Sequence, residues 1–164
     1  MPMPIDRLVV ELRCKDAALR AVAAEKLCQG GDAARPAAVA LVQAAGDSAE
    51  EVREWAVSAL EELGPPAAAD VAPLAALVAS DNPDIGYWAA TLLGRLGDRA
   101  AAAAPQLGQA LAVAALPVRE RAAWALAQIG PAAKAATEPL KLAAASSDAR
   151  LARLAAEALT RIES

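Results

Sequence analysis

Histidine and phenylalanine are absent from this sequence of 164 residues, and the other aromatic residues are limited to three tryptophans and one tyrosine. Histidine is the usual acid–base group near neutral pH and a frequent metal ligand. The sequence also has no Cys-x-x-Cys pair, no phosphate-binding P-loop and no Gly-x-Ser-x-Gly nucleophile motif. We therefore predict that the protein is not an enzyme, and we assign no catalytic residue, no metal ligand and no cofactor-binding residue.

Cysteine and long apolar runs are also scarce. The chain is long enough to bury a core without disulfides, so Cys14 and Cys28 are interpreted as reduced thiols that pack like small apolar residues. No apolar run reaches the roughly 18 residues of a membrane-spanning helix without a charge or a proline. The first residues, MPMPIDR, lack the basic region and apolar core of a secretion signal. We expect a cytoplasmic protein.

Positive charge is in deficit. The chain carries 16 Lys and Arg against 20 Asp and Glu, which gives a net charge of −4. Residues 1–84 hold 7 basic and 14 acidic side chains, whereas residues 85–164 hold 9 and 6. Non-specific binding to nucleic acid or to an anionic membrane requires a basic surface. We therefore expect an acidic first half and a weakly basic second half. This charge balance disfavours nucleic acid as the partner, and we expect no membrane partner.

Alanine, in contrast, is abundant, with 49 residues, and much of it lies in one repeated segment. Residues 118–130 read VRERAAWALAQIG, and the segments IGYWAATLLGRLG and VREWAVSALEELG precede it at intervals of 33 residues. Weaker copies are LRAVAAEKLCQGG at residues 19–31 and LARLAAEALTRIE at residues 151–163. Alanine is the best helix former, and a fixed period of this length is typical of stacked helical repeats.

The 33-residue period predicts an all-α, right-handed α-solenoid of HEAT-like helix pairs. We call the first helix of each repeat the A helix and the second the B helix. Residues 1–164 are treated as one domain, with a half repeat 1–14, repeats 15–47, 48–80, 81–113 and 114–146, and a final helix 147–164. A helices are expected near 16–29, 48–63, 81–96, 116–129 and 147–162. B helices are expected near 4–13, 33–45, 67–79, 100–113 and 132–145.

Residues at the helix ends support these boundaries. Ser48 and Glu51 match a capping box at the second A helix, and Asp81 and Ser147 stand in the Ser48 column of later repeats. Four glycines follow the A helices, at positions where a positive φ is common and a side chain is strained. They are Gly31, Gly64, Gly97 and Gly130.

Apolar residues occupy fixed columns that recur once per repeat and form one stripe along each A helix. These columns contain Leu19, Val52, Ile85, Val118 and Leu151; Ala23, Ala56, Ala89, Ala122 and Ala155; Leu27, Leu60, Leu93, Leu126 and Leu159; and Leu63, Leu96, Ile129 and Ile162. The B helices contribute Leu8, Leu41, Leu74, Leu107 and Leu140. At the ends of the array we expect Leu8, Leu12, Leu154 and Ile162 to be partly exposed, which predicts weak homo-association through the helix ends.

The segment VRERAAWALAQIGPAAKAATEPLKLAA closely resembles bacterial HEAT repeats of the phycobilisome-lyase-like (E-Z) type. Their pattern is a Val-Arg start, an Ala-rich helix, an Ile/Leu-Gly-Pro turn and an Ala-x-x-Pro-Leu second helix. The resemblance covers nearly the whole chain. It implies a general binding scaffold, with B helices on a concave face and A helices on a convex face. Gly86 and Ala152 depart from the pattern, because arginine occupies their column elsewhere.

The resemblance also implies that Arg20, Arg53 and Arg119 form hydrogen bonds between repeats rather than an anion site. Trp55 and Trp88 share a column at the edge of the apolar stripe and are interpreted as packing residues. Tyr87 and Trp124 lie in columns otherwise held mostly by polar residues. An aromatic side chain there either anchors a partner protein or fills a gap between Ala-rich A helices, and the sequence leaves both interpretations open.

Variable residues of the B helices are the other candidates for protein binding. They are Asp70, Pro73, Ala76, Gln106, Gln109, Lys134, Glu138 and Lys141. Because these side chains are mostly small and do not converge in charge, they favour a protein surface over a small-molecule pocket. We predict a non-enzymatic protein–protein interaction scaffold or adaptor that acts alone or as a subunit of a larger assembly. The sequence does not identify its partner protein. Two alternatives stay open: an accessory for bilin attachment or turnover on phycobiliproteins, and a HEAT-like nucleic-acid-binding protein.

Overall fold

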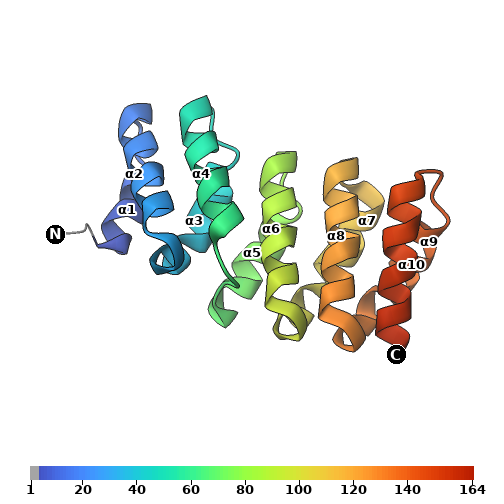
Figure 1. Cartoon of the computed structure of the whole chain (residues 1–164). Coiled ribbons are helices and arrows are strands. Elements are labelled where there is room, and N and C mark those ends of the chain that lie inside the picture. The colour runs from blue at the N-terminus through green and yellow to red at the C-terminus, as the bar shows by residue number, and fades with distance from the viewer. Residues whose placement is uncertain (1–3) are drawn as a thin grey trace. The chain divides into compact units, whose positions relative to one another are not determined.

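The computed structural model describes residues 4–164, and every regular element within that range is a helix (Figure 1). The first three residues of the expected half repeat 1–14, and of the segment MPMPIDR, lie outside the described residues. The all-α solenoid class predicted from the period is confirmed. The chain divides into two compact units, Met1–Ala67 and Ala68–Ser164, which are described separately. A single domain over residues 1–164 stays a prediction.

The first unit consists of two A helices and two B helices. Its elements are α1 (Ile5–Glu11), α2 (Ala17–Gln29), the 3-10 helix η1 (Gly31–Ala37), α3 (Ala38–Ala44) and α4 (Glu50–Glu62). The A helices α2 and α4 pack against each other, while the B helices α1 and α3 pack against α2 and α4 respectively. The predicted A helices near 16–29 and 48–63 are therefore confirmed to within about two residues.

The second unit contains three A helices and three B helices. Its elements are η2 (Ala68–Asp70), α5 (Val71–Leu77), α6 (Pro83–Leu96), η3 (Gly97–Ala103), α7 (Ala104–Val113), α8 (Leu116–Ile129), η4 (Gly130–Ala136), α9 (Thr137–Ala144) and α10 (Ala149–Glu163). The A helices α6, α8 and α10 form one row, and α7 contacts both other B helices, α5 and α9 (Figure 1).

Most B helices begin with a 3-10 helix, which the 33-residue pattern does not predict. In a 3-10 helix, side chains three residues apart lie on the same face. Three pairs of alanines with this spacing point into the core and are almost completely buried. They are Ala34 and Ala37, Ala100 and Ala103, and Ala133 and Ala136. Only small side chains fit at these buried positions. The alanines therefore allow the 3-10 helices to pack closely against the core.

The caps of the A helices differ from the predicted ones. Ser48 does not cap α4, whose N-cap residue is Ala49; instead, the Oδ1 atom of Asp47 accepts a hydrogen bond from the Ala49 amide at 2.8 Å. At α6 and α10 the caps are Asn82 and Asp148 rather than Asp81 and Ser147. At α6 and α10 the physical reason is that the Asn82 amide and the Asp148 carboxylate accept hydrogen bonds from free N–H groups of the first turn, those of Asp84 and Leu151.

Three of the four glycines adopt the predicted positive φ, with values of 52° at Gly31, 65° at Gly97 and 69° at Gly130. Gly64 is the exception and has no positive φ. After α4 the backbone becomes extended, with φ −70° and ψ 127° at Leu63. The chain thus leaves α4 one residue earlier, at Leu63, so the turn does not need a positive φ at Gly64. The sequence prediction for Gly64 is therefore wrong.

The apolar columns form the core, with a few exceptions. Leu19 is 51% exposed, because α2 is the first A helix within residues 4–164 and no other A helix of that range packs on this side of it. Leu159, on the last A helix, and Ile85 are partly exposed. The predicted exposed ends are mostly wrong: Leu8, Leu12 and Ile162 are 3%, 5% and 3% exposed. The helices α2 and η1 cover α1, and α8, α9 and η4 pack on α10.

None of the helices formed by residues 4–164 combines the length and the apolar character that a membrane crossing requires.

Candidate functional site

The candidate site lies on the B helices of the second unit, and its central residues are Gln106 and Gln109. Both side chains are exposed and stand one turn apart on α7. Residues three positions apart are neighbours on a helix surface, so the two amides form a short polar ridge. An amide side chain both donates and accepts hydrogen bonds. The two predicted glutamines are thus brought together.

A shallow groove of about 460 Å³ lies on one side of this ridge. Both glutamines line it, together with residues of α5 and of the end of α7, including Ala76, Val78 and Val113. Val113 is 84% exposed. The surface of this groove is therefore largely apolar. The two glutamines on α7, and Ser80 and Asp81 after α5, supply its hydrogen-bonding groups.

A second groove, of about 490 Å³, lies between α7 and α9. Gln109 lines it from one side, and Glu138 and Leu142 line it from the other. Leu142 is 77% exposed. Gln109 thus borders both grooves. Gln106 also borders a third, of about 450 Å³, near the start of α5.

The remaining predicted residues do not join these grooves. Asp70, Lys134 and Lys141 line none of the three, nor does Pro73. Lys141 forms an ion pair with Glu138 at 2.9 Å, and this hydrogen bond raises the pKa of Lys141. Because both side chains are largely exposed, the pair contributes little to stability.

Tyr87 lies on α6 and Trp124 on α8, which are A helices of the second unit. The glutamine ridge is on the B helix α7. The guanidinium of Arg121 lies over both rings, 4.5 Å from the Tyr87 centroid and 4.9 Å from the Trp124 centroid. Arg121 also donates a hydrogen bond to the Tyr87 hydroxyl. Both aromatic side chains are partly exposed. They therefore fill a gap between α6 and α8 and still present a surface to solvent.

Trp88 is buried, as its packing role predicts, with 9% exposure. Arg95 lies over its ring at 5.8 Å from the centroid, and Tyr87 contacts it edge-on at 5.5 Å between centroids. Trp55, in the corresponding column of the first unit, is partly exposed. The two tryptophans thus share a column but differ in burial.

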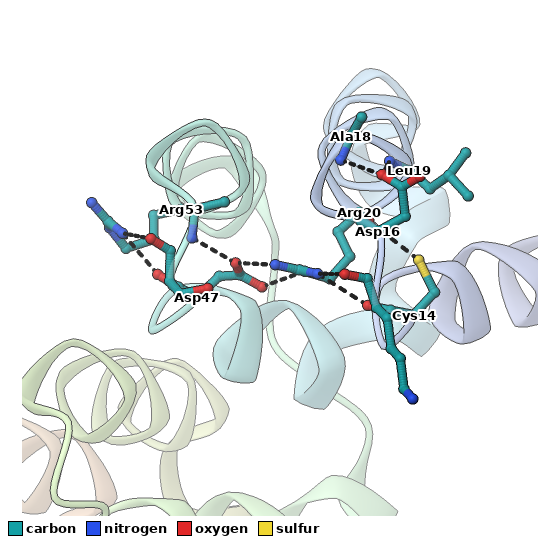
Figure 2. Close-up of polar contacts among 10 residues, drawn as sticks. Cys14, Asp16, Ala18, Leu19, Arg20, Asp47 and Arg53 are labelled. Carbon is teal, nitrogen blue, oxygen red and sulfur yellow. Dashed lines mark hydrogen bonds and ion pairs between the residues drawn. The ribbon is translucent and has the colours of Figure 1, made fainter.

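Each of the arginines Arg20, Arg53 and Arg119 donates a hydrogen bond across a repeat boundary, as the resemblance implies, although the Arg20–Asp47 ion pair lies within repeat 15–47. Figure 2 shows Arg20 of α2 making two bonds of 2.8 Å to the carboxylate of Asp47, which stands just before α4. Arg20 also donates to the carbonyl oxygens of Cys14 and Lys15. Arg53 donates to the carbonyl oxygens of Asp47 and Ser48. In the second unit, Arg119 donates to the Leu111 carbonyl at 2.7 Å.

Asp47 connects this network to the cap of α4, because it accepts from both Arg20 and the Ala49 amide. The hydrogen bond from Arg20 is the main cause that lowers the pKa of Asp47, although partial burial acts in the opposite direction. Each of the three arginines thus donates to the backbone or to a carboxylate of this chain, which agrees with the structural interpretation of the column.

Neither cysteine forms a disulfide, and the Sγ atom of Cys14 donates a hydrogen bond to the Asp16 carbonyl oxygen at 3.3 Å. Burial, together with Glu62 and Glu25, raises the pKa of the Cys28 thiol. A raised pKa lowers the fraction of reactive thiolate. Among the described residues, no group of three or more Cys, Asp or Glu side chains is arranged to hold a metal ion.

Sequence reasoning missed two residues that organise the A-helix surface, Arg121 and Gly94. A Cβ atom at Gly94 would lie 2.3 Å from the Cζ3 atom of Trp124. Glycine is therefore what allows the indole to lie against α6. The available signal was a glycine inside a helix, which is costly unless close packing requires it.

The comparisons with known proteins agree with this architecture. A family model described as PBS lyase HEAT-like repeat matches residues 52–71 and 118–146. A search of curated proteins found no match. The chain is similar to a designed armadillo repeat protein in complex with the peptide (KR)4, with a TM-score of 0.67 and 21% identity over 99% of this chain and 83% of that one.

Two further solved structures are similar to the chain. One is an engineered protein, with a TM-score of 0.65 and 23% identity over 97% of this chain and 79% of that one. The other is the complex of CpcE and CpcF of phycocyanin lyase from Nostoc sp. PCC7120, with a TM-score of 0.62 and 24% identity over 98% of this chain and 65% of that one. At these identities the likeness shows the fold alone.

Proposed function

We propose that the chain is a non-enzymatic scaffold that binds an extended segment of a partner protein. Residues 52–71 and 118–146 match the PBS lyase HEAT-like repeat, which supports this proposal. The binding surface is formed by α5, α7 and α9 of the second unit. The observation that carries this proposal is the position of Gln109 between two apolar grooves of about 460 and 490 Å³.

An extended peptide suits this surface for two reasons. Its backbone offers N–H and C=O groups that need partners, and the Gln106 and Gln109 amides supply both donors and acceptors. Successive side chains of an extended strand point to opposite sides, so apolar side chains could enter the grooves on either side of Gln109. Val113 and Leu142, 84% and 77% exposed, would lose contact with water on binding.

The similar structures support a binding role without identifying the partner. The designed armadillo repeat protein is in complex with a peptide, and CpcE and CpcF form a complex with each other. The shallow apolar grooves favour a macromolecular segment over a small molecule, since ligand pockets usually enclose most of a small ligand.

The test is affinity capture from the native host with the wild-type protein and two matched variants. Gln109→Lys places a long cation at the border of both grooves, and Ala156→Lys places the same side chain on the exposed surface of α10. We expect a partner that is recovered by the wild-type protein and by Ala156→Lys, but not by Gln109→Lys. Equal recovery with all three proteins would remove the B-helix surface as the binding site.

A second candidate function is an accessory role in bilin attachment or turnover. The description of the matching family model as a PBS lyase repeat favours it. The test is to mix the protein with a bilin and an apo-phycobiliprotein and to record absorbance. Faster appearance of the spectrum of the attached bilin supports this role, whereas unchanged rates with several phycobiliproteins exclude it.

A further inference from the structure

Arg121 occupies an unusual position on the A-helix surface of the second unit. Its guanidinium contacts the Tyr87 ring and the Trp124 ring, at 4.5 and 4.9 Å from their centroids. Contacts with two aromatic faces hold a cation in place by electrostatic attraction to the ring electrons. Arg121 is therefore held in a fixed position at the surface.

A cavity of about 340 Å³ adjoins this arginine. Tyr87, Trp124, Pro117 and Leu154 provide its apolar and aromatic walls. Arg121, Arg150 and Glu120 provide its charged groups. The cavity therefore combines the three residue types that contribute most at protein interfaces, which are tryptophan, tyrosine and arginine.

The charge of this cavity is not balanced. Glu120 is the acidic residue in its wall, and it forms an ion pair with Arg150 at 3.3 Å. Within residues 4–164, no carboxylate lies within ion-pair distance of Arg121. An arginine guanidinium binds a carboxylate with two parallel hydrogen bonds when one is available. The cavity thus has the chemistry to receive a carboxylate beside an apolar group.

The first unit of the same chain presents such carboxylates. Residues 1–67 hold 11 acidic and 7 basic side chains, whereas residues 68–164 hold 9 of each. On α4, Glu50, Glu51 and Glu54 are exposed. Among the described residues none of the three takes part in an ion pair. Glu50 and Glu54 are four residues apart, so their like charges repel and a cationic partner would relieve that repulsion.

We propose that the cavity around Arg121 is a docking site for a second copy of this chain, which inserts Glu50 or Glu54 of its α4 helix. The carboxylate binds the Arg121 guanidinium, and Trp124 and Tyr87 exclude water around the pair. The contact is head-to-tail, since it joins two different surfaces, so it produces chains of molecules unless the geometry closes a ring. It is independent of the B-helix surface.

The first test is sedimentation equilibrium of the full-length protein over a concentration series. The average mass of the wild-type protein should rise with concentration, and this rise should weaken as NaCl increases from about 50 to about 500 mM, because salt screens exposed charges. A monomer at every concentration and both salt levels would overturn the proposal.

Charge-reversal variants test whether the Arg121 cavity and the α4 helix are the two surfaces in contact. Arg121→Glu should raise the apparent dissociation constant about tenfold or more, and its control Arg99→Glu, at an exposed position, should change it by less than about twofold. Because Arg121→Glu could disturb packing, Glu50→Arg/Glu54→Arg removes the other half of the contact at exposed positions. Its control is Asp98→Arg/Glu163→Arg, which makes the same change in net charge. Equal effects of each variant and its control would overturn the proposal.

Mixing the two reversed variants gives the sharpest result. Arg121→Glu alone and Glu50→Arg/Glu54→Arg alone should each associate far more weakly than the wild-type protein, but their mixture should associate again. The reversed α4 helix of one variant then meets the reversed cavity of the other, and the unchanged α4 helix and cavity meet as they do in the wild-type protein. A mixture that remains monomeric while the wild-type protein associates would show that these two surfaces do not meet. Association of the wild-type protein would then have to use another face.

Discussion

At the scale of single residues, Gly94 and Trp124 form a contact that allows no added atom. A Cβ atom at position 94 would lie 2.3 Å from Cζ3 and 2.9 Å from Cε3 of Trp124. Gly94→Ala should therefore lower the free energy of unfolding by about 1–3 kcal/mol, the usual cost of overpacking. Urea denaturation followed by circular dichroism measures this value.

The cause of that loss can be isolated with a second substitution. In the background of Trp124→Ala, the indole is gone and Gly94→Ala should cost little or even stabilise α6, because alanine is the better helix former. The two changes should therefore be clearly non-additive. Additive losses would mean that the clash with Trp124 is not what position 94 must avoid.

Burial rather than residue type should decide the cost of a leucine truncation. Leu93 is fully buried in α6, whereas Leu142 on α9 is 77% exposed. Leu93→Ala should cost roughly 2–5 kcal/mol, while Leu142→Ala should stay within about 0.5 kcal/mol. Similar values for the two variants in chemical denaturation would contradict the assignment of the core.

The contacts of Arg121 with Tyr87 and Trp124 could not be predicted from the 33-residue repeat pattern alone. The columns align residues 33 apart, but Arg121 contacts Tyr87, which is 34 positions away, across the boundary between neighbouring A helices. The aromatic residues were recognised as exceptions in polar columns. The cation between them was not, because side-chain direction across two packed helices depends on their relative rotation.

At the scale of elements, Asp47 connects the end of α3 with α2 and α4. It accepts two hydrogen bonds of 2.8 Å from Arg20 and one of 2.8 Å from the Ala49 amide. Its side chain is 13% exposed. Asp47→Ala should therefore cost roughly 1–3 kcal/mol, as expected when partly buried donors lose their acceptor. Glu138→Ala, which removes an exposed ion pair, is the control and should cost about 0–1 kcal/mol.

The same residue gives a pH prediction. The hydrogen bond from Arg20 lowers the pKa of Asp47 in the folded protein. The stabilisation is therefore complete above the unfolded-state pKa of about 3.9, and it is lost as the pH falls through the lower folded-state pKa. Asp47→Asn removes this titration. The difference in unfolding free energy between wild type and Asp47→Asn should thus shrink in acid, and a constant difference between pH 6 and pH 3 would contradict the assignment.

Glycine at the ends of A helices is required by backbone geometry rather than by space. Gly130 has φ 69° and ψ −140°, a region nearly restricted to glycine, although an added Cβ would meet no atom within 4 Å. Gly130→Ala should cost about 1–3 kcal/mol. Gly64, with no positive φ and only ordinary Cβ contacts at 3.4 Å, is the matched control. Thermal denaturation of the two alanine variants should show a clearly larger loss at position 130.

The helices themselves were predictable because periodicity and composition agree. The A helix expected near 116–129 is α8, Leu116–Ile129. The 3-10 starts of the B helices were not predicted, because alanines three or four residues apart fit both a 3-10 helix and an α-helix. The predicted N-cap positions were wrong by one residue. Asp47, Ser48 and Ala49 are all possible N-cap positions for α4, and only the hydrogen-bond geometry distinguishes them.

At the scale of the whole molecule, the sequence predicted the helical repeat and the exposed glutamines but not the grooves beside them. Gln106 and Gln109 are recognisable as polar residues on an Ala-rich B helix. The grooves depend on how α5, α7 and α9 are spaced, and the packing of small side chains sets that spacing. The second unit therefore offers two distinct surfaces, the glutamine ridge on its B helices and the Arg121 cavity on its A helices.

Site-specific photo-crosslinking in the native host tests the central claim, that a partner protein binds the B-helix surface, most directly. A photoreactive residue replaces either Gln109, between two grooves, or Ala156, exposed on α10. After irradiation, the protein labelled at position 109 should form one discrete adduct with another protein, and the protein labelled at position 156 should not form it. An adduct at position 156 alone, or the same adduct from both positions, would contradict binding at the glutamine ridge.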